Sequence, residues 1–287
     1  TGQSPMAISG KAAIAGVIGW PVGHSLSPRL HGYWLDCYGI DGAYIPLAVE
    51  PADIIAAIHA LAKLGFAGAN VTVPHKQAAA AAADRLDDNA RRLGAVNTIT
   101  VGKDGTITGS NTDGFGFMEN LRHGAPDWRA EHGPAVVLGA GGAARAVVAA
   151  LGDAGVAEVR VVNRTFERAE QLADDLGGNI SPLAWDALSD ALGDAGVLVN
   201  TTTLGMAGQA RLDIDLAALP VAAVVNDIVY GPLETELLSA SRARGNTVVE
   251  GIGMLLHQAR PGFAAWFGQE PEVTPELRKH IVEALKG

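Results

Sequence analysis

Short apolar runs alternate with amphipathic stretches through the first third of the chain. The runs at 12–18, 43–49 and 69–73 have the length and the β-branched content of buried strands. The stretches at 53–65 and 77–86 carry alanine and leucine at helical intervals, and the first of them ends at a glycine. Because strands that alternate with helices are typical of parallel sheets, the pattern predicts an α/β unit here.

Two local signals add to this unit. Ser27 followed by Pro28 predicts the beginning of a helix, with the serine as N-cap and the proline in the first turn. The alternating segments 97–101 and 105–109 predict a β-hairpin that turns at 103–105.

The same alternation begins again after a polar, proline-containing loop at 123–134. Residues 134–165 predict a complete strand–helix–strand unit. Further strands, with helices between them, are predicted at 197–203, 222–230 and 247–255. The tail 256–287 is helical in pattern, and Thr274-Pro275 predicts the start of its last helix. The chain therefore predicts two α/β units joined by short connections, and a cleft between such units is a usual ligand site.

Size and composition agree with a globular protein of two domains. Of the 287 residues, 48% are apolar and 18% are charged, which is enough to bury substantial cores. The formal net charge of −10 disfavours nucleic acid and anionic membranes as partners, since clustered lysine and arginine bind both. A small anionic substrate is compatible with this charge where local donors hold it.

Cysteine and histidine usage argues against disulfide and metal chemistry. Cys37 is the only cysteine, and the eight histidines show no ligand spacing such as HExxH. No apolar run approaches the roughly 18 residues of a membrane span, and no basic-then-apolar leader is visible. We therefore expect no bound metal and a reducing, cytoplasmic location. The residues before Met6 have no role that the sequence assigns.

A glycine-rich segment, GAGGAA at 139–144, follows an apolar strand and begins an alanine-rich stretch. It fits the dinucleotide fingerprint G-x-G-x-x-G/A, in which Gly139 makes the tight turn and Gly141 lets a pyrophosphate approach the backbone. Gly142 and Ala143 then lie at the helix N-terminus, whose dipole favours phosphate. Glycine-rich turns also occur for packing alone, but this one sits inside a full strand–helix–strand unit, which favours a dinucleotide site.

The end of the following strand indicates which dinucleotide is bound. An NAD site usually has an acidic residue about 20 residues after the glycines, which hydrogen-bonds the ribose 2′-hydroxyl. This chain instead has Asn163-Arg164-Thr165 there and Arg168 one turn later. Two guanidinium groups and a hydroxyl suit a 2′-phosphate. NADP(H) is therefore expected, although two arginines at a solvated helix start would explain the same residues without a ligand.

Four polar clusters lie where predicted strands of the first unit end or turn. They are the segments 24–27, 70–76, 95–98 and 111–113. Each has a structural alternative, because Ser27 and Asp113 would cap helices, Asn97 would brace a turn and Lys76 would be a solvated loop residue. Together they offer hydroxyls, amides, one cation and one carboxylate, and ligands collect at the carboxyl ends of parallel strands. The clusters predict a site for a small polyhydroxylated acid.

A proton donor is needed when a nicotinamide delivers hydride to a carbonyl carbon, since an alkoxide develops there. Lys76 is the candidate, with Asp113 to position it. Burial lowers the pKa of a lysine and a neighbouring aspartate raises it, so the sequence leaves the balance of these effects open.

Nine blocks of the chain resemble, in order and spacing, the shikimate dehydrogenases. They are GWPVGHSLSP, NVTVPHK, GAVNT, NTDG, GAGGAARA, NRT, NTTTLGM, DIVYGPLET and GIGMLLHQA. The resemblance covers roughly 12–268 and implies NADPH-dependent reduction of 3-dehydroshikimate to shikimate, a step of aromatic amino-acid biosynthesis. It also implies a substrate-binding domain of 1–112 completed by C-terminal helices at 255–287, and a Rossmann-type NADP-binding domain at 113–254.

The resemblance further implies roles for single residues. Ser25 and Ser27 would hold the substrate carboxylate, and Lys76 with Asp113 would form the catalytic pair. The hydroxyls of the substrate would be bonded by Thr72, Asn97 and Gln258, with Tyr230 beside it. The nicotinamide side would be lined by Asn200, Thr201, Gly253 and Met254, and the 2′-phosphate motif would be Asn163, Arg164, Thr165 and Arg168.

Three other functions compete with this one. A catabolic quinate/shikimate dehydrogenase working with NAD would carry an acidic residue after the strand 159–162, where this chain has Asn163. A non-catalytic NADPH-binding regulator would not need both Lys76 and Asp113. A folate-linked dehydrogenase would leave the serine pair at 25 and 27 without a purpose. The pattern leaves a monomer and a homodimer equally open.

Overall fold

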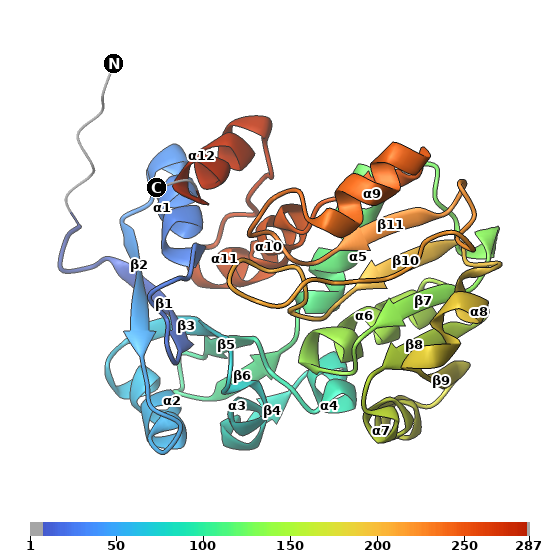
Figure 1. The fold of residues 1–287 in the computed structure, drawn as a ribbon. Coiled ribbons are helices and arrows are strands. Elements are labelled where there is room, and N and C mark those ends of the chain that lie inside the picture. The colour runs from blue at the N-terminus through green and yellow to red at the C-terminus, as the bar shows by residue number, and fades with distance from the viewer. Residues whose placement is uncertain (1–7, 286–287) are drawn as a thin grey trace. The chain divides into compact units, whose positions relative to one another are not determined.

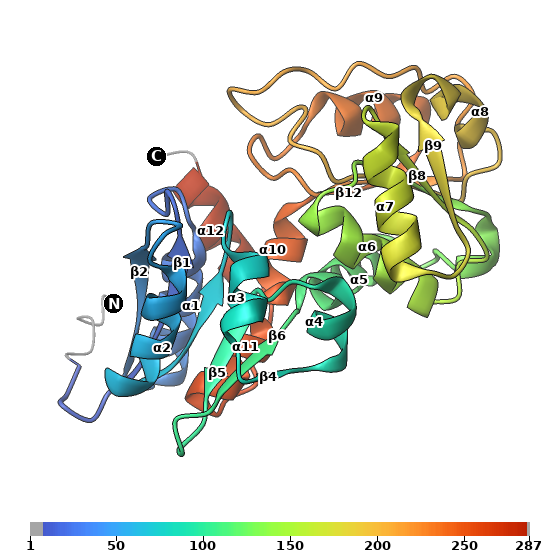
Figure 2. The same cartoon turned by 90° about the horizontal axis from the view of Figure 1, so that it is seen from below.

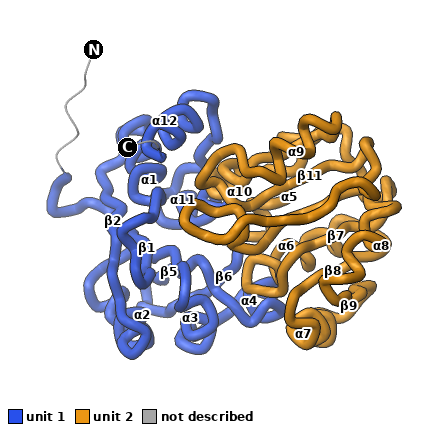
Figure 3. The backbone as a smooth tube through the Cα atoms, viewed as in Figure 1, with its two compact units in different colours: residues 1–112, 258–287 blue, residues 113–257 orange. Residues whose placement is uncertain are grey.

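The computed structural model describes residues 8–285, and the residues before Met6 lie outside that range. The chain divides into two compact units. Unit 1 consists of residues 1–112 with 258–287, and unit 2 of residues 113–257 (Figure 3). The chain returns to unit 1 at Gln258, the last residue of the helix Ile252–Gln258.

Unit 1 is built on a six-stranded mixed sheet (Figure 1). Its strands are β1 (Ala13–Gly19), β2 (Gly42–Ala48), β3 (Phe66–Val71), β4 (Arg85–Leu86), β5 (Thr98–Val101) and β6 (Ile107–Ser110). They lie in the order β2-β1-β3-β5-β6-β4. β1 is parallel to both of its neighbours, whereas β5 runs antiparallel to β3 and β6. The predicted hairpin at 97–109 is the β5–β6 pair.

Helices cover both faces of this sheet. They are α1 (Ser27–Tyr38), α2 (Ile54–Lys63), α3 (Lys76–Ala82), α4 (Asp88–Leu93), α11 (Arg260–Phe267) and α12 (Pro275–Leu285). On one face, Ile58 of α2 and Ala79 of α3 are fully buried against Ala69 and Ile99 of the sheet. The C-terminal helix α11 packs on β1, β3 and β5, and the Trp266 indole donates to the Ile99 carbonyl at 2.9 Å.

Unit 2 is a six-stranded, wholly parallel sheet. Its strands are β7 (Ala135–Leu138), β8 (Val159–Asn163), β9 (Ile180–Ala184), β10 (Val197–Asn200), β11 (Val224–Asp227) and β12 (Thr247–Val249). They lie in the order β12-β11-β10-β7-β8-β9. The direction of strand order reverses between β7 and β10, and such a switch point is where dinucleotides bind in open α/β sheets.

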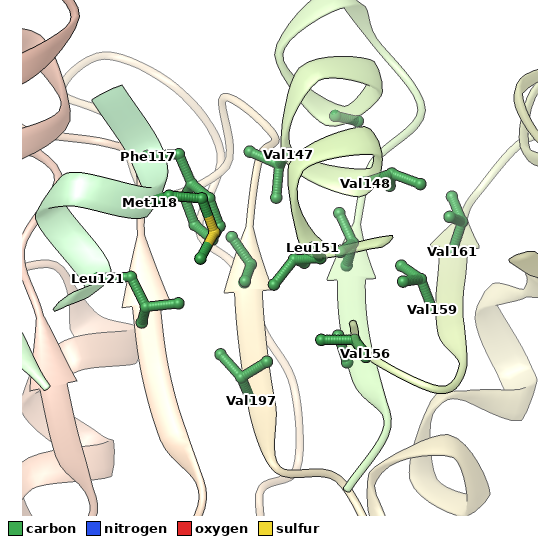
Figure 4. Close-up of a cluster of buried hydrophobic side chains, with 14 of the residues drawn as sticks. Phe117, Met118, Leu121, Val147, Val148, Leu151, Val156, Val159, Val161 and Val197 are labelled. Atoms are coloured by element: carbon green, nitrogen blue, oxygen red, sulfur yellow. The ribbon is translucent and has the colours of Figure 1, made fainter. Parts of the chain in front are cut away.

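The helices of unit 2 also lie on both faces of its sheet (Figure 2). They are α5 (Asp113–Gly124), α6 (Gly142–Asp153), α7 (Phe166–Leu176), α8 (Leu188–Leu192), α9 (Glu236–Arg244) and α10 (Ile252–Gln258), with short 3₁₀ helices η1 (Ala130–His132) and η2 (Trp185–Ala187). Phe117 and Leu121 of α5 and Leu151 of α6 pack on Val137 and Val161 of the sheet (Figure 4). The alternate strand residues face a second core under α8 and α9. Among the described residues, every helix is too short or too polar to cross a bilayer.

Two predicted boundaries and one predicted helix were wrong. The helix predicted at 77–86 ends at Ala82, since Asp84 pairs with Ile107 and draws Arg85–Leu86 into the sheet as β4. The strand predicted at 247–255 ends at Val249, and α10 begins at Ile252. In the described chain no helix connects β10 to β11, where a long loop buries leucines against the second core instead.

Of two predicted helix starts, one N-cap is confirmed and the other is wrong. Thr274 caps α12 as expected, accepting a hydrogen bond from the Leu277 N–H at 3.2 Å. Ser27 is not an N-cap but the first residue of α1, and its N–H donates to the Ser25 hydroxyl at 3.3 Å. The Ser27 side chain is consequently released from capping.

Candidate active site

In unit 1, the predicted substrate residues follow the carboxyl ends of β1 and β3. Ser25 is half-buried and Ser27 is buried, in the turn from β1 into α1. Thr72 follows β3 and stays attached to the sheet, because its N–H donates to the Ile18 carbonyl at 2.9 Å. Lys76 is half-buried and is the first residue of α3. The parallel pairing of β1 with β3 thus places the serine pair, Thr72 and Lys76 at one edge of the sheet.

Asn97 is the centre of a buried polar network at the same edge. Its side chain is 3% exposed, and its Oδ1 accepts the Thr112 N–H at 2.9 Å. Its Nδ2 lies 3.1 Å from Thr112 Oγ1 and 3.5 Å from Gln258 Oε1. The Thr112 hydroxyl in turn donates to the Gln258 carbonyl at 2.8 Å. The structure therefore brings together Asn97 and Gln258, which are far apart in sequence.

A second layer beneath this network escaped sequence reasoning. The Tyr44 hydroxyl donates to Asn70 Oδ1 at 2.6 Å, and Asn70 Nδ2 donates to the Asn97 carbonyl at 3.1 Å and to Thr98 Oγ1 at 3.2 Å. Burial raises the pKa of Tyr44 well above its usual value, so its hydroxyl stays protonated. The His31 ring stacks on Tyr44 at 3.9 Å. Asn70 stood inside a polar cluster of the sequence, but nothing local marked Tyr44 or His31.

Asp113 occupies the first position of α5 and directly follows Thr112 of the Asn97 network. Its side chain is 6% exposed. A carboxylate is favoured at this end of a helix by the helix dipole. Asp113 opens unit 2, whereas Lys76 belongs to unit 1.

The glycine-rich segment of unit 2 has the shape of a phosphate site. Gly139 follows β7 with φ of 104°, and a Cβ there would lie 2.9 Å from Thr201 Oγ1, so only glycine fits. A Cβ on Gly141 or Gly142 would meet open space, and both residues lie at the start of α6. Ala143 follows them, half-buried, in the first turn. A ligand phosphate therefore has both room and backbone N–H donors at this helix end.

The end of β8 presents two unpaired cations. Asn163 Nδ2 donates to the Thr165 carbonyl at 2.7 Å, which closes a tight turn before α7. Arg164 and Arg168 are exposed, and neither guanidinium has an ion pair among residues 8–285. The neighbouring Arg145, by contrast, is paired with Asp175 at 2.8 Å. Free guanidinium groups fit an anionic group such as the 2′-phosphate of NADP(H).

The remaining predicted residues of unit 2 follow β10 and β11 or lie in α10. The Thr201 hydroxyl donates to the Leu138 carbonyl at 2.6 Å, across the switch point. Gly253 lies so close to Asn120 that a Cβ would be 1.8 Å from its Oδ1, and Met254 is buried beside it. Tyr230 is half-buried, and burial raises the pKa of its hydroxyl. In the part of the chain that the structure describes, no three histidine, cysteine or acidic side chains are arranged to hold a metal ion.

Each unit contains a segment that matches a known protein family. Residues 17–99 match the family model of the shikimate dehydrogenase substrate binding domain, and residues 127–206 match that of shikimate / quinate 5-dehydrogenase. A shikimate dehydrogenase (NADP(+)) of Paramagnetospirillum magneticum is 61% identical, over 96% of this chain and 100% of its own.

Solved structures agree with these matches. A shikimate 5-dehydrogenase of Thermus thermophilus in complex with NADP(H) and shikimate has a TM-score of 0.83 at 35% identity, covering 96% of this chain and 98% of its own. A quinate dehydrogenase of Corynebacterium glutamicum in complex with NAD has a TM-score of 0.88 at 32% identity, covering 95% and 99%. The predicted fold class, a mostly parallel α/β substrate domain and a Rossmann-type NADP domain, is confirmed, and so is the resemblance to the shikimate dehydrogenases.

Proposed function

This chain belongs to the shikimate dehydrogenase family, and we propose that Lys76 and Asp113 are the catalytic pair with which it interconverts 3-dehydroshikimate and shikimate. The enzyme is an oxidoreductase that uses NADP(H). Its substrate domain is unit 1, and its cofactor domain is unit 2.

The observation that carries the catalytic pair is the attachment of both residues to the Asn97 network. The Lys76 carbonyl accepts the N–H of Val96, next to Asn97, at 2.9 Å. Asp113 directly follows Thr112, whose N–H and hydroxyl bond Asn97. Lys76 is thus bonded through its backbone to the residue before Asn97, and Asp113 directly follows a residue that bonds the Asn97 side chain.

The proposed chemistry is a proton transfer coupled to reduction. When bound, NADPH supplies the hydride that reduces the carbonyl carbon. The Lys76 ammonium donates its proton to the developing alkoxide, and in the reverse direction the neutral amine takes the proton from the hydroxyl. Asp113 orients the ammonium and bonds a neighbouring substrate hydroxyl.

The other unit 1 residues would hold the substrate in place. We assign Ser25 and Ser27 to its carboxylate, and their position after β1, at the same edge of the sheet as Thr72, supports this role. Thr72, Asn97 and Gln258 would bond its hydroxyls, and Tyr230 would lie beside it. The cofactor would be held by Gly139, Gly141, Gly142, Ala143, Asn163, Arg164, Thr165, Arg168, Thr201, Gly253 and Met254.

Quinate oxidation with NAD is a competing activity with specific support, because a quinate dehydrogenase in complex with NAD is among the similar structures. The residues at the end of β8 argue against NAD as the cofactor of this chain. The strand ends at Asn163 and is followed by an exposed, unpaired arginine, where an NAD site would carry a carboxylate.

A four-way assay tests the proposal. Absorbance at 340 nm is followed with shikimate or quinate as substrate and NADP⁺ or NAD⁺ as oxidant. Rapid reduction of NADP⁺ by shikimate, with little reaction in the other three mixtures, is the expected result. Turnover of quinate with NAD⁺ as the fastest pair would instead assign the catabolic activity.

Location and assembly belong to the same proposal. We place the enzyme in the cytoplasm, with its one cysteine, Cys37, exposed and unbridged. We further propose a monomer or a homodimer, and light scattering on the eluting protein would distinguish them from larger assemblies.

A further inference from the structure

A buried carboxylate in unit 2 is left unexplained by the proposed mechanism. Asp227 is the last residue of β11 and is fully buried, with 0% exposure. β11 is hydrogen-bonded to β10, and Asp227 pairs in register with Asn200 at the end of that strand. Both residues therefore lie at the carboxyl edge of the sheet, next to the switch point.

Asp227 accepts hydrogen bonds from three separate segments. Its Oδ1 accepts the Asn200 Nδ2 at 2.9 Å and the Val229 N–H at 3.0 Å. Its Oδ2 accepts the Thr235 hydroxyl at 2.7 Å. Thr235 is in turn the N-cap of α9. One side chain thus joins the end of β10, the segment after β11 and the start of α9.

The Asn200 side chain also forms hydrogen bonds with the loop after β10. Its Oδ1 accepts the Thr202 N–H at 3.0 Å and the Thr202 hydroxyl at 2.7 Å. Its Nδ2 also donates to the Leu204 carbonyl at 3.2 Å. The conformation of residues 200–204 is consequently held by a side chain whose own orientation depends on Asp227.

We propose that Asp227 is a positioning residue, which holds the loop 200–204 and the segment 228–230 in the one arrangement that presents Thr201 to the nicotinamide and Tyr230 to the substrate. The assignment of Thr201 and Tyr230 to these ligands rests on the proposed function. The fixed arrangement of the two segments does not, since it follows from the hydrogen bonds alone.

A carboxylate suits this position because it accepts bonds on two oxygens and needs no donor in return. Burial raises its pKa, and the three donors oppose that effect. An apolar side chain of similar size would leave the Asn200 amide and the Val229 N–H unpaired in a buried place. An asparagine would keep an acceptor for both of them.

The variants follow from this difference. Asp227→Leu removes every acceptor, and Asp227→Asn is the conservative replacement. The matched control is Asn246→Leu, because Asn246 is a buried side chain at the opposite edge of the sheet that bonds the carbonyls of Pro220, Val221 and Ala223. It removes a similar number of buried hydrogen bonds without touching either loop.

Two measurements separate positioning from general destabilisation. The first is peptide-level amide hydrogen exchange of the intact enzyme, which needs no turnover. Asp227→Leu should accelerate exchange in 200–204 and in 228–230, whereas Asp227→Asn and Asn246→Leu should leave both segments protected. The second is steady-state kinetics with shikimate and NADP⁺, together with the deuterium isotope effect in the reverse direction, where labelled NADPH donates its hydride to 3-dehydroshikimate.

For Asp227→Leu we expect kcat to fall by about 10²-fold, since small misplacements of reacting groups cost that much. The isotope effect should rise, the affinity for NADPH should change by no more than about three-fold, and Asp227→Asn should restore most of kcat. A folded Asp227→Leu enzyme with unchanged exchange and unchanged kcat would overturn the proposal, as would an equal loss of kcat in Asn246→Leu.

If Asp227→Leu does not fold, Thr235→Val takes its place. It removes one donor to the carboxylate, keeps the side-chain shape, and should produce the same changes in exchange and isotope effect to a smaller degree. Unchanged values would again overturn the proposal. Wild-type protein that binds NADPH but oxidises no shikimate would refute the proposed function, and the exchange results would still decide the role of Asp227.

Discussion

The buried histidine in unit 1 makes the stability of this enzyme sensitive to acid. The His31 ring is fully buried among aromatic side chains, stacked on Tyr44 and edge-on to Trp34 at 5.6 Å. Neither ring nitrogen has a hydrogen-bond partner among the described residues. Burial lowers its pKa from 6.5 to about 3, and the neighbouring Asn70 opposes this only in part. The folded enzyme therefore holds this imidazole neutral.

The size of the effect follows from proton linkage. Between pH 3 and pH 6.5 the unfolded chain binds a proton at this position and the folded chain does not, so stability falls as the pH falls. One pKa unit corresponds to about 1.4 kcal/mol. With a folded pKa of about 3, His31 alone should lower the free energy of unfolding by about 2 kcal/mol between pH 7 and pH 5.

The substitution His31→Phe isolates this contribution. Phenylalanine keeps a flat ring in the aromatic cluster but cannot take up a proton. Urea unfolding, followed by tryptophan fluorescence at pH 7 and pH 5, gives the two free energies for each protein. The wild type should lose about 2 kcal/mol more than the variant on acidification, whatever the absolute stability of the variant.

His132→Gln is the matched control, because it removes an exposed histidine from η1. It should reproduce the wild-type loss on acidification. Equal losses in wild type and His31→Phe would show that His31 takes up its proton in the folded state, and the reasoning from burial would be refuted.

Two further substitutions test single features. Arg164→Ala should weaken NADPH binding by about 10- to 100-fold, because a charge-assisted hydrogen bond is lost, and should leave NADH binding unchanged. Fluorescence titration measures both affinities, with Arg211→Ala as the control. Equal losses for the two cofactors would argue against the 2′-phosphate role. Asp87→Ala removes the side chain that accepts the Ala90 N–H and caps α4; it should cost about 1 kcal/mol in urea unfolding, and an unchanged midpoint would contradict the capping assignment.

The sequence predicted best what depends on local order. The strand–helix–strand unit around Gly139 was predicted because turn, strand period and helix start all lie within 134–165, and the structure has β7, α6 and β8 there. The polar residues after β1 and β3 could be grouped for a similar reason, since parallel pairing brings strand ends to one edge.

What escaped prediction depends on contacts between distant segments. Arg85–Leu86 leaves the helical pattern because it pairs with β6, which is more than 20 residues away in the sequence. Tyr44 and Asp227 are ordinary strand residues in the sequence. Only the fold sets them beside Asn70 and Asn200.

The measurement that tests the account most directly is the turnover of Lys76→Ala with shikimate and NADP⁺, beside wild type and the control Lys103→Ala in the β5–β6 turn. Loss of the proton-transferring group should lower kcat by about 10²- to 10⁴-fold and change the KM for shikimate by only a few-fold. Lys103→Ala should match the wild type. A Lys76→Ala enzyme that is folded, binds NADPH and keeps a near-normal kcat would contradict the central claim that Lys76 moves the proton.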